Sequence, residues 1–262
     1  MQRPNPLSRA STDQPWQTRV AWGVGSLFGF LLFWELIALL LQHRHLPTPT
    51  VVFAVMMGEA ASGELPYHIG MTLFRVSIAF VFAMLIGSAI GIVMGRNGRI
   101  DQAFDSWLIL FLNLPALVII ILCYVWFGRT EVAAIIAVAV NKLPNVAVTV
   151  REGARALSRD LAEMAHMYRF GPWKTLRHVI LPQLAPYFLA SARTGLSLVW
   201  KIVLVVELLG RSNGVGFQLG TYFQMFDVSM ILAYALAFII VVQIIEFAIL
   251  QPIAARVNKW RR

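Results

Sequence analysis

Long apolar runs constrain this chain more than any other feature. The first extends from Val20 to Gln42 and contains one charged residue, Glu35. Five more follow, at 66–95, 104–127, 132–150, 186–209 and 229–250. A helix crosses a bilayer with about 20 apolar residues, and a helix satisfies its own backbone hydrogen bonds in lipid. The sequence therefore predicts an all-α membrane protein with six transmembrane helices.

Composition agrees with this class. Of the 262 residues, 58% are hydrophobic and 13% are charged, whereas a soluble domain has about 25% charged residues. The net charge of +9 does not point to nucleic acid, because basic and aromatic residues do not interleave on a soluble face. The single cysteine, Cys123, lies in an apolar run and excludes an intrachain disulfide.

The distribution of Lys and Arg predicts the orientation. Fifteen of the 22 basic residues lie in one alternating set of polar segments, and three lie in the other set, 43–65, 128–131 and 210–228. Cytoplasmic segments carry the basic excess. We therefore expect a multi-pass membrane protein with both termini cytoplasmic.

This orientation divides the chain into a predicted layout. A cytoplasmic tail (1–19) precedes the first transmembrane helix (20–42), and a core of five helices (65–250) precedes a basic cytoplasmic tail (251–262). We expect a short helix near 51–60, a third span that continues through Pro115, and a loop or re-entrant segment at 210–228. Gly87, Gly91 and Gly95 recur every four residues, which predicts close approach of another helix.

The longest cytoplasmic insert, 151–185, is polar, basic and helix-forming. Ser158 is placed to cap a helix that ends near Tyr168, Gly171 breaks it, and Pro172 suits the first turn of a second helix. His166, Tyr168 and Trp173 are candidate surface side chains. A loop that lies on lipid headgroups is the alternative interpretation, because basic amphipathic helices often do so.

The insert resembles the EAA loop of permeases of ATP-binding-cassette (ABC) importers. Glu163, Ala165, Leu181 and Pro182 are in register with that loop, while Met164 replaces its middle alanine. Arg169 stands where its glycine is expected, and Gly171 follows two residues later, which predicts a shifted turn. The resemblance implies an ATPase-coupling site at Glu163, Met164, Ala165, His166, Tyr168, Gly171, Trp173, Leu181 and Pro182.

Residues 46–262 as a whole resemble nitrate/sulfonate/taurine-type permeases. The resemblance is carried by Leu46-Pro47-Thr48-Pro49, Thr72-Leu73-Phe74-Arg75, Trp126-Phe127-Gly128, Glu207 and Gly214-Val215-Gly216-Phe217. It implies a type I ABC importer permease of the bacterial inner (plasma) membrane, with cytoplasmic coupling helices. It also implies a homodimer, two ATPase subunits and a periplasmic solute-binding protein. The chain has no G-x-x-x-x-G-K-[ST] phosphate loop, so we expect no cofactor and no enzymatic activity of its own, with ATP bound by the partner subunit.

Charged residues within the spans are candidates for a translocation path, because such residues face protein or water. The candidates are Lys142, Lys201, Trp200, Glu207 and Arg75, and the two lysines favour a small anionic solute. Glu35 and Arg75 could instead pair between the first two spans. His43 and His45 lack further ligands nearby, so no metal site is expected.

Two other function classes stay open at this point. An ion-coupled secondary transporter could use Lys201 and Glu207 as a relay, although it leaves the basic insert without a role. A non-transporting membrane assembly protein could use the insert to bind a partner. Sensitivity of uptake to a protonophore, and co-purification of an ATPase, separate these classes.

Overall fold

The computed structural model describes residues 16–43, 45–250 and 252, and every regular element within them is helical. Most of the two predicted tails, 1–19 and 251–262, lies outside the described residues, but residues 16–19 begin the first helix rather than a tail. In chain order the helices are α1 (Trp16–Leu41), α2 (Pro49–Ser62), α3 (Glu64–Arg96), α4 (Gly98–Asn113), α5 (Ala116–Phe127), α6 (Glu131–Arg155), α7 (Arg159–Met167), α8 (Pro172–Thr175), η2 (Leu176–Ile180), α9 (Leu181–Gly210), α10 (Val215–Gln224), α11 (Val228–Ile245) and η3 (Glu246–Leu250).

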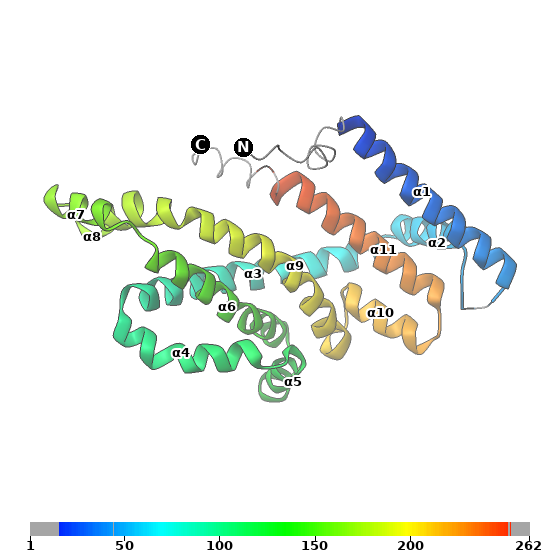
Figure 1. Cartoon of the computed structure of the whole chain (residues 1–262). Helices are drawn as coiled ribbons and strands as arrows, with labels where there is room; N and C mark the ends of the chain where they lie inside the picture. The colour runs from blue at the N-terminus through cyan, green and yellow to red at the C-terminus, as the bar shows by residue number, and fades with distance from the viewer. Residues whose placement is uncertain (1–15, 44, 251, 253–262) are drawn as a thin grey trace, which may run out of the picture.

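Three long helices, α3, α6 and α9, pack against one another and form the centre of the molecule (Figure 1). The main buried cluster joins side chains of these three helices with others from α5, α10 and α11, among them Val138, Val199 and Tyr234. Helices α1 and α2 lie beside α11 at one end (Figure 1). The α7–α8 segment lies at the opposite end (Figure 1).

The glycine repeat of α3 brings that helix against α6, as predicted. A Cβ atom at Gly91 would lie 2.6 Å from the carbonyl oxygen of Ala147, and one at Gly95 would lie 2.6 Å from Cβ of Ala154. Gly87 meets α6 in the same way at Val146. Small residues on one face allow this approach between membrane helices because no side chain stands between the backbones.

Contrary to expectation, the third span does not continue unbroken through Pro115. Its residues form two helices, α4 and α5, with an angle of 96° between them. The bend falls at Leu114, which is extended (φ −68°, ψ 127°), and at Pro115, which precedes α5. Proline disfavours the helical conformation of the preceding residue and offers no N–H to continue the ladder. Pro144 has no such effect, since α6 continues through it.

The helix of the fifth span begins before Pro186, where the apolar run predicted its start. Helix α8, the π-helical turn η2 and α9 form a continuous helical segment of 39 residues, Pro172–Gly210. Within it, the Leu181 N–H bonds to the carbonyl of Leu176, five residues back. Pro182 cannot donate a backbone hydrogen bond, and a widened turn accommodates such a residue within a helix. The helix therefore extends well beyond the apolar part of the span.

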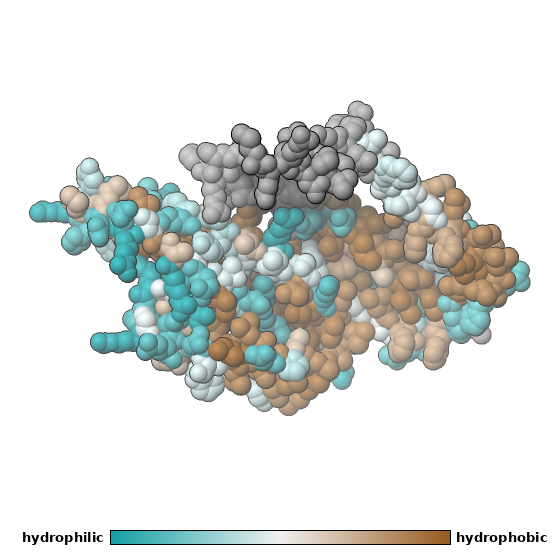
Figure 2. Space-filling view, viewed as in Figure 1, coloured by the Kyte–Doolittle hydropathy of each residue, from teal (hydrophilic) through white to brown (hydrophobic). Residues whose placement is uncertain are grey.

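In the part of the chain that the structure describes, four helical segments are long and apolar enough to cross a membrane, and the α4–α5 pair makes five if it counts as one bent span. In α1, the apolar stretch Gly25–Leu41 is shorter than these. The segment expected as a loop or re-entrant stretch contains the short helix α10. Figure 2 shows hydrophilic residues gathered at the end where α7 and α8 lie, whereas the middle and the opposite end are mainly hydrophobic.

Candidate functional site

The insert folds into two short helices, α7 and α8, which we call the hairpin (residues 158–175). The Ser158 hydroxyl accepts a hydrogen bond from the Leu161 N–H at 3.4 Å and caps α7. Helix α7 ends at Met167, with Tyr168 as its C-cap, and α8 begins at Pro172. The predicted start, end and restart are therefore confirmed.

The turn of the hairpin lies at Arg169, so the prediction of a turn shifted to Gly171 was wrong. Arg169 has a φ of +52°. Its N–H donates to the carbonyl of His166 at 3.0 Å, and the Phe170 N–H donates to the carbonyl of Ala165 at 2.9 Å. This is the Schellman pattern of helix termination, in which a left-handed residue is usually glycine. Gly171 has an ordinary φ of −64°.

The hairpin is held at its base by buried contacts. Ala165 points inward and is buried. The Ser158 N–H donates to Oε1 of Gln183 at 3.0 Å, and Nε2 of Gln183 donates to the Val179 carbonyl at 2.8 Å. A small apolar cluster of Ala154, Ile180 and Leu184 joins the end of α6 to η2 and α9. These contacts fix the hairpin to the two central helices.

The outer surface of the hairpin carries large apolar side chains. Met167, Tyr168 and Trp173 are 81%, 74% and 70% exposed. Aromatic residues and methionine are enriched in protein–protein interfaces, so this surface is suited to bind another protein. Of the nine residues predicted for coupling, Ala165 alone is buried; the exposed ones are Glu163, Met164, His166, Tyr168, Gly171, Trp173, Leu181 and Pro182.

A second polar site lies where α3, α6 and α9 meet, at the end of the molecule far from the hairpin. Nη1 of Arg75 lies 2.6 Å from Oε1 of Glu207, and Nη2 lies 2.7 Å from Oε1 of Glu131. Arg211 also pairs with Glu131. We call these four residues the arginine–glutamate cluster. Arg75 and Glu207 are buried within the chain, where a charge is tolerated only when it is paired.

Glu207 also fixes the segment between α9 and α10. Its Oε2 atom accepts hydrogen bonds from the Thr72 hydroxyl and from the Gly216 N–H, both at 2.9 Å. Gly214 has a φ of +107°, and a Cβ atom there would lie 2.3 Å from the carboxyl carbon of Glu207. Only glycine combines this conformation with this closeness. Arg75 and Glu207 thus hold helices together here, and their place in a translocation path stays a prediction.

The expected pairing of Glu35 with Arg75 was wrong. Glu35 accepts hydrogen bonds from the Thr50 N–H at 3.3 Å and from the Thr50 hydroxyl at 3.0 Å. The carboxylate therefore ties α1 to the first turn of α2 instead. The positions of Glu35 and Arg75 in the sequence did not show that α2 packs between α1 and α3.

The two lysines of the spans have different surroundings. Lys142 of α6 is 2% exposed, and its side chain crosses Gly195 of α9, where a Cβ atom would lie 2.2 Å from Cε. Lys201 of α9 is exposed. Trp200 is buried and packs edge-on against Phe238, with ring centroids 5.8 Å apart. Within the described residues, neither lysine has a hydrogen-bonded or ion-paired partner.

Comparison with known proteins assigns the chain to a family. Residues 83–256 match the family model described as "Binding-protein-dependent transport system inner membrane component". This chain belongs to that family. The matched segment contains the hairpin and all the central helices except the first part of α3. The chain is therefore a permease subunit of an ABC importer, of the sulfonate/taurine/nitrate type, and a multi-pass inner-membrane protein.

Relatives of the permease cover nearly its whole length. It is 27% identical over 262 residues to SsuC of Bacillus subtilis (strain 168), whose name refers to transport of aliphatic sulfonates, with 98% of this chain and 95% of that protein covered. It is 24% identical over 253 residues to the taurine transport system permease protein TauC of Escherichia coli (strain K12), covering 94% and 92%.

A solved structure shows the same fold. The permease resembles a chain of the MetNI methionine ABC transporter in an inward-facing conformation, with a TM-score of 0.64 and 19% identity over 74% of this chain and 98% of that one. Membership of this family implies an ATPase and a solute-binding protein as partners.

Sequence reasoning did not find two members of the arginine–glutamate cluster, Glu131 and Arg211. Glu131 was counted in an outer loop, yet it begins α6 of the permease and accepts two hydrogen bonds from Arg75. Thr130, which accepts from the Ala133 N–H at 3.1 Å, marks that helix start. A threonine followed by an acidic residue ahead of an apolar run is the signal that could have placed Glu131 in a first helical turn.

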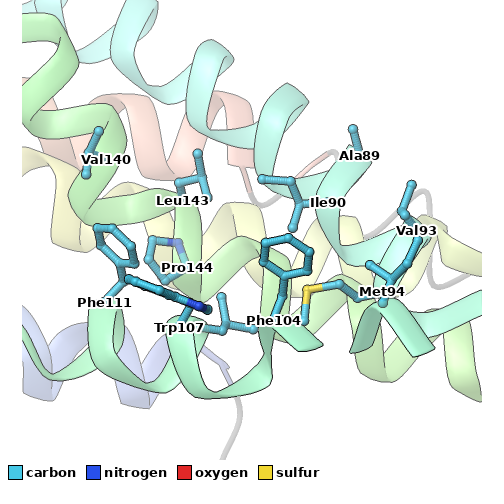
Figure 3. Close-up of a pocket in the computed structure, with 12 residues that line it drawn as sticks. Ala89, Ile90, Val93, Met94, Phe104, Trp107, Phe111, Val140, Leu143 and Pro144 are labelled. Atoms are coloured by element: carbon cyan, nitrogen blue, oxygen red, sulfur yellow. The ribbon is translucent and has the colours of Figure 1, made fainter. Parts of the chain in front are cut away.

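An apolar groove on the permease is no candidate for a polar solute. It has a volume of about 580 Å³ and lies between α3, α4 and α6. Figure 3 shows Phe104, Trp107 and Phe111 of α4 facing Ile90, Leu143 and Pro144 across it. All its lining side chains are apolar apart from the Trp107 ring nitrogen, so it offers almost nothing to bind a charge.

Proposed function

We propose that this permease imports a small organic anion, such as a sulfonate, by ATP-driven alternating access. Two copies of the chain form the path between them, two ATPase subunits bind at their hairpins, and a periplasmic binding protein delivers the solute. The hairpin and both termini are cytoplasmic in this arrangement. ATP is bound by the ATPase subunits, and the permease itself carries no cofactor and no catalytic residue.

The hairpin is the observation that carries this proposal. Its exposed Met167, Tyr168 and Trp173 provide an apolar surface for the ATPase, and its base is fixed to α6 and α9 by Gln183 and by buried apolar contacts. A rigid surface at the end of two central helices can pass a displacement of the ATPase to the membrane helices. Closure and opening of the ATPase pair would then rotate the permease copies against each other.

Lys201 supports an anionic solute. It is exposed on the single chain and shares one face of α9 with Thr194, Ser197, Leu198 and Val205, all of which are exposed. A lysine within a span faces water or protein rather than hydrocarbon. Two copies related by a two-fold axis would set two such faces opposite each other. The enclosed path would carry two ammonium groups and some hydroxyls, which suits an anion.

Lys142 is the second cation that we assign to the path. It is buried and unpartnered among the described residues, and the notch at Gly195 leaves room for it. An unpaired buried ammonium is costly, and a passing anion would relieve that cost in a more open conformation. Arg75, Trp200 and Glu207, by contrast, are engaged in packing or pairing in this conformation, and they border the path only if it opens toward the arginine–glutamate cluster.

Uptake of radiolabelled ethanesulfonate by cells that express the whole transporter tests this proposal. We expect Lys201→Gln to lower the initial rate by at least about tenfold at an unchanged membrane level, because each copy of the chain then loses its ammonium group from the path. Lys201→Arg keeps the charge and should retain most of the uptake. Unchanged flux in Lys201→Gln and in Lys142→Gln would reject an anion path through these lysines.

The same assay separates ATP-driven import from an ion-coupled relay through Lys201 and Glu207. Glu207 already binds Arg75, Thr72 and the Gly216 N–H, and no ion pair joins it to Lys201 in the described chain. With ATP held constant, a protonophore should leave uptake unchanged. Loss of uptake under those conditions would favour the relay.

A further inference from the structure

A small polar cavity lies at the end of α9 that is far from the hairpin. Its volume is about 330 Å³, at the lower end of the range of small-ligand sites. One wall consists of the end of α9 and the segment after it, a second is one face of α10, and Arg129 completes it. The lining residues are Arg129, Leu208, Leu209, Gly210, Arg211, Ser212, Phe217, Gly220, Thr221 and Gln224.

Charge around this cavity is positive. Three arginines, Arg75, Arg129 and Arg211, stand against the two carboxylates Glu131 and Glu207. The side chain of Arg129 is exposed and has no hydrogen-bonded or ion-paired partner within the described part of the chain. In the cavity wall, Nε of Arg211 is buried without a hydrogen-bond partner.

Helix α10 turns an uncharged face, with Thr221 and Gln224 as its polar members, to the cavity. Phe217, Gly220, Thr221 and Gln224 follow the spacing of one helical face. Its other faces meet neighbouring elements, since Gln218 bonds His68 and the Tyr222 ring lies 5.8 Å from that of Tyr234, which donates to Glu59. The acidic side chain Glu59 therefore lies behind α10 rather than in the cavity.

The cavity adjoins the face of α9 that carries Lys201. Leu208 lines the cavity, and it lies two turns beyond Lys201 on the same exposed face of the helix, with Val205 between them. Seven residues of α-helix span about 10 Å. An anion held in the cavity would thus lie about 10 Å along α9 from the ammonium group of Lys201.

From this arrangement we infer that the cavity is an entry site for a small organic oxyanion, held by the guanidinium of Arg129 before it reaches Lys201. The inference rests on the proposed function, because it takes the face of α9 as the path. A guanidinium presents several N–H donors in a planar fork that matches two oxygens of a sulfonate or carboxylate. The Ser212 hydroxyl and the Gln224 amide, both exposed, supply further donors.

The test is charge-selective labelling of a cysteine in the cavity wall of the full transporter, ATPase included, in lipid nanodiscs without ATP. Ser212→Cys is made with Cys123→Ala, which removes the single native cysteine. Its reaction rates with the sulfonatoethyl and the trimethylammonioethyl methanethiosulfonate reagents are compared. We expect the ratio of the anionic rate to the cationic rate to be about tenfold higher at this position than for free cysteine in solution.

Arg129→Gln should abolish most of this preference, and Arg129→Lys should keep part of it. Millimolar ethanesulfonate should slow labelling, while uncharged methanesulfonamide should not. The matched control is Ser62→Cys, at the exposed last residue of α2, where Arg129→Gln should change nothing. An equal preference in Arg129→Gln, or no protection by ethanesulfonate, would overturn the inference.

If Ser212→Cys does not assemble, Gln224→Cys with the buried Cys123 retained gives the same comparison from the opposite side of the cavity. The assay needs neither ATP nor transport. Selective labelling without anion uptake would therefore contradict the proposed function alone, and anion uptake without selective labelling would contradict the entry site alone.

Discussion

Arg169 holds a backbone conformation that suits glycine. Its φ of +52° costs a residue with a Cβ atom about 1 kcal/mol, and its exposed side chain has no hydrogen-bonded or ion-paired partner among the described residues that would offset this cost. We predict that Arg169→Gly stabilises the end of α7 by about 1 kcal/mol, measured as roughly fivefold slower hydrogen exchange of the α7 amides. Gly171→Ala, at an ordinary φ with no atom within 4 Å, should have little effect. Faster exchange in Arg169→Gly would contradict this view of the turn.

Arg75 neutralises a carboxylate that has no access to water. In Arg75→Leu, Glu207 would remain buried and unpaired, and loss of one partner of a buried pair costs about 3–5 kcal/mol. We expect a marked fall in the thermal midpoint of the detergent-solubilised permease. The double variant Arg75→Leu/Glu207→Leu should recover a large part of it, because no charge is then stranded. A double variant that is less stable than Arg75→Leu would argue against this account.

At the scale of elements, the α3–α6 contact depends on glycines at particular positions. Gly91→Ala would press a methyl group against the Ala147 carbonyl at 2.6 Å, and such overpacking costs about 1–3 kcal/mol. Gly70, on the same helix, has no atom within 4 Å. Gly70→Ala should therefore stabilise α3 slightly through helix propensity. The midpoint temperatures of thermal unfolding of the two variants should shift in opposite directions. Similar shifts would show that the α3–α6 contact is not as tight as described.

At the scale of the whole molecule, the hairpin should govern assembly with the ATPase. Tyr168→Ala or Trp173→Ala removes an exposed aromatic residue, and aromatic anchors of interfaces contribute about 2 kcal/mol or more. We predict that the dissociation constant for the ATPase becomes approximately 30-fold larger. Titration of labelled ATPase onto the permease in nanodiscs measures it.

The control for this prediction is Trp126→Ala. Trp126 is similarly exposed, at 67%, but it lies in α5. Its substitution should leave the ATPase affinity unchanged. Equal weakening by Trp126→Ala and Trp173→Ala would mean that the hairpin is not the binding surface.

Much of this fold could be read from local patterns. Apolar runs predicted the spans, the spacing of Gly87, Gly91 and Gly95 predicted a close helix contact, and Ser158 and Pro172 predicted the helix starts of the hairpin, because each of these signals acts within a few residues. The same reasoning could have predicted the bend at Pro115, since proline acts on its direct neighbour. The prediction gave more weight to the long apolar run and therefore missed the bend.

The sequence by itself determined that this chain lies in a membrane, that it is helical, and that a basic hairpin interrupts its spans, because hydropathy and capping are properties of neighbouring residues. Only the tertiary structure decided which charges meet. Arg75 and Glu207 are separated by 132 positions along the chain, and no local pattern distinguishes that pair from Arg75 with Glu35. Pairing between distant residues depends on how helices pack, and packing is a property of the whole chain.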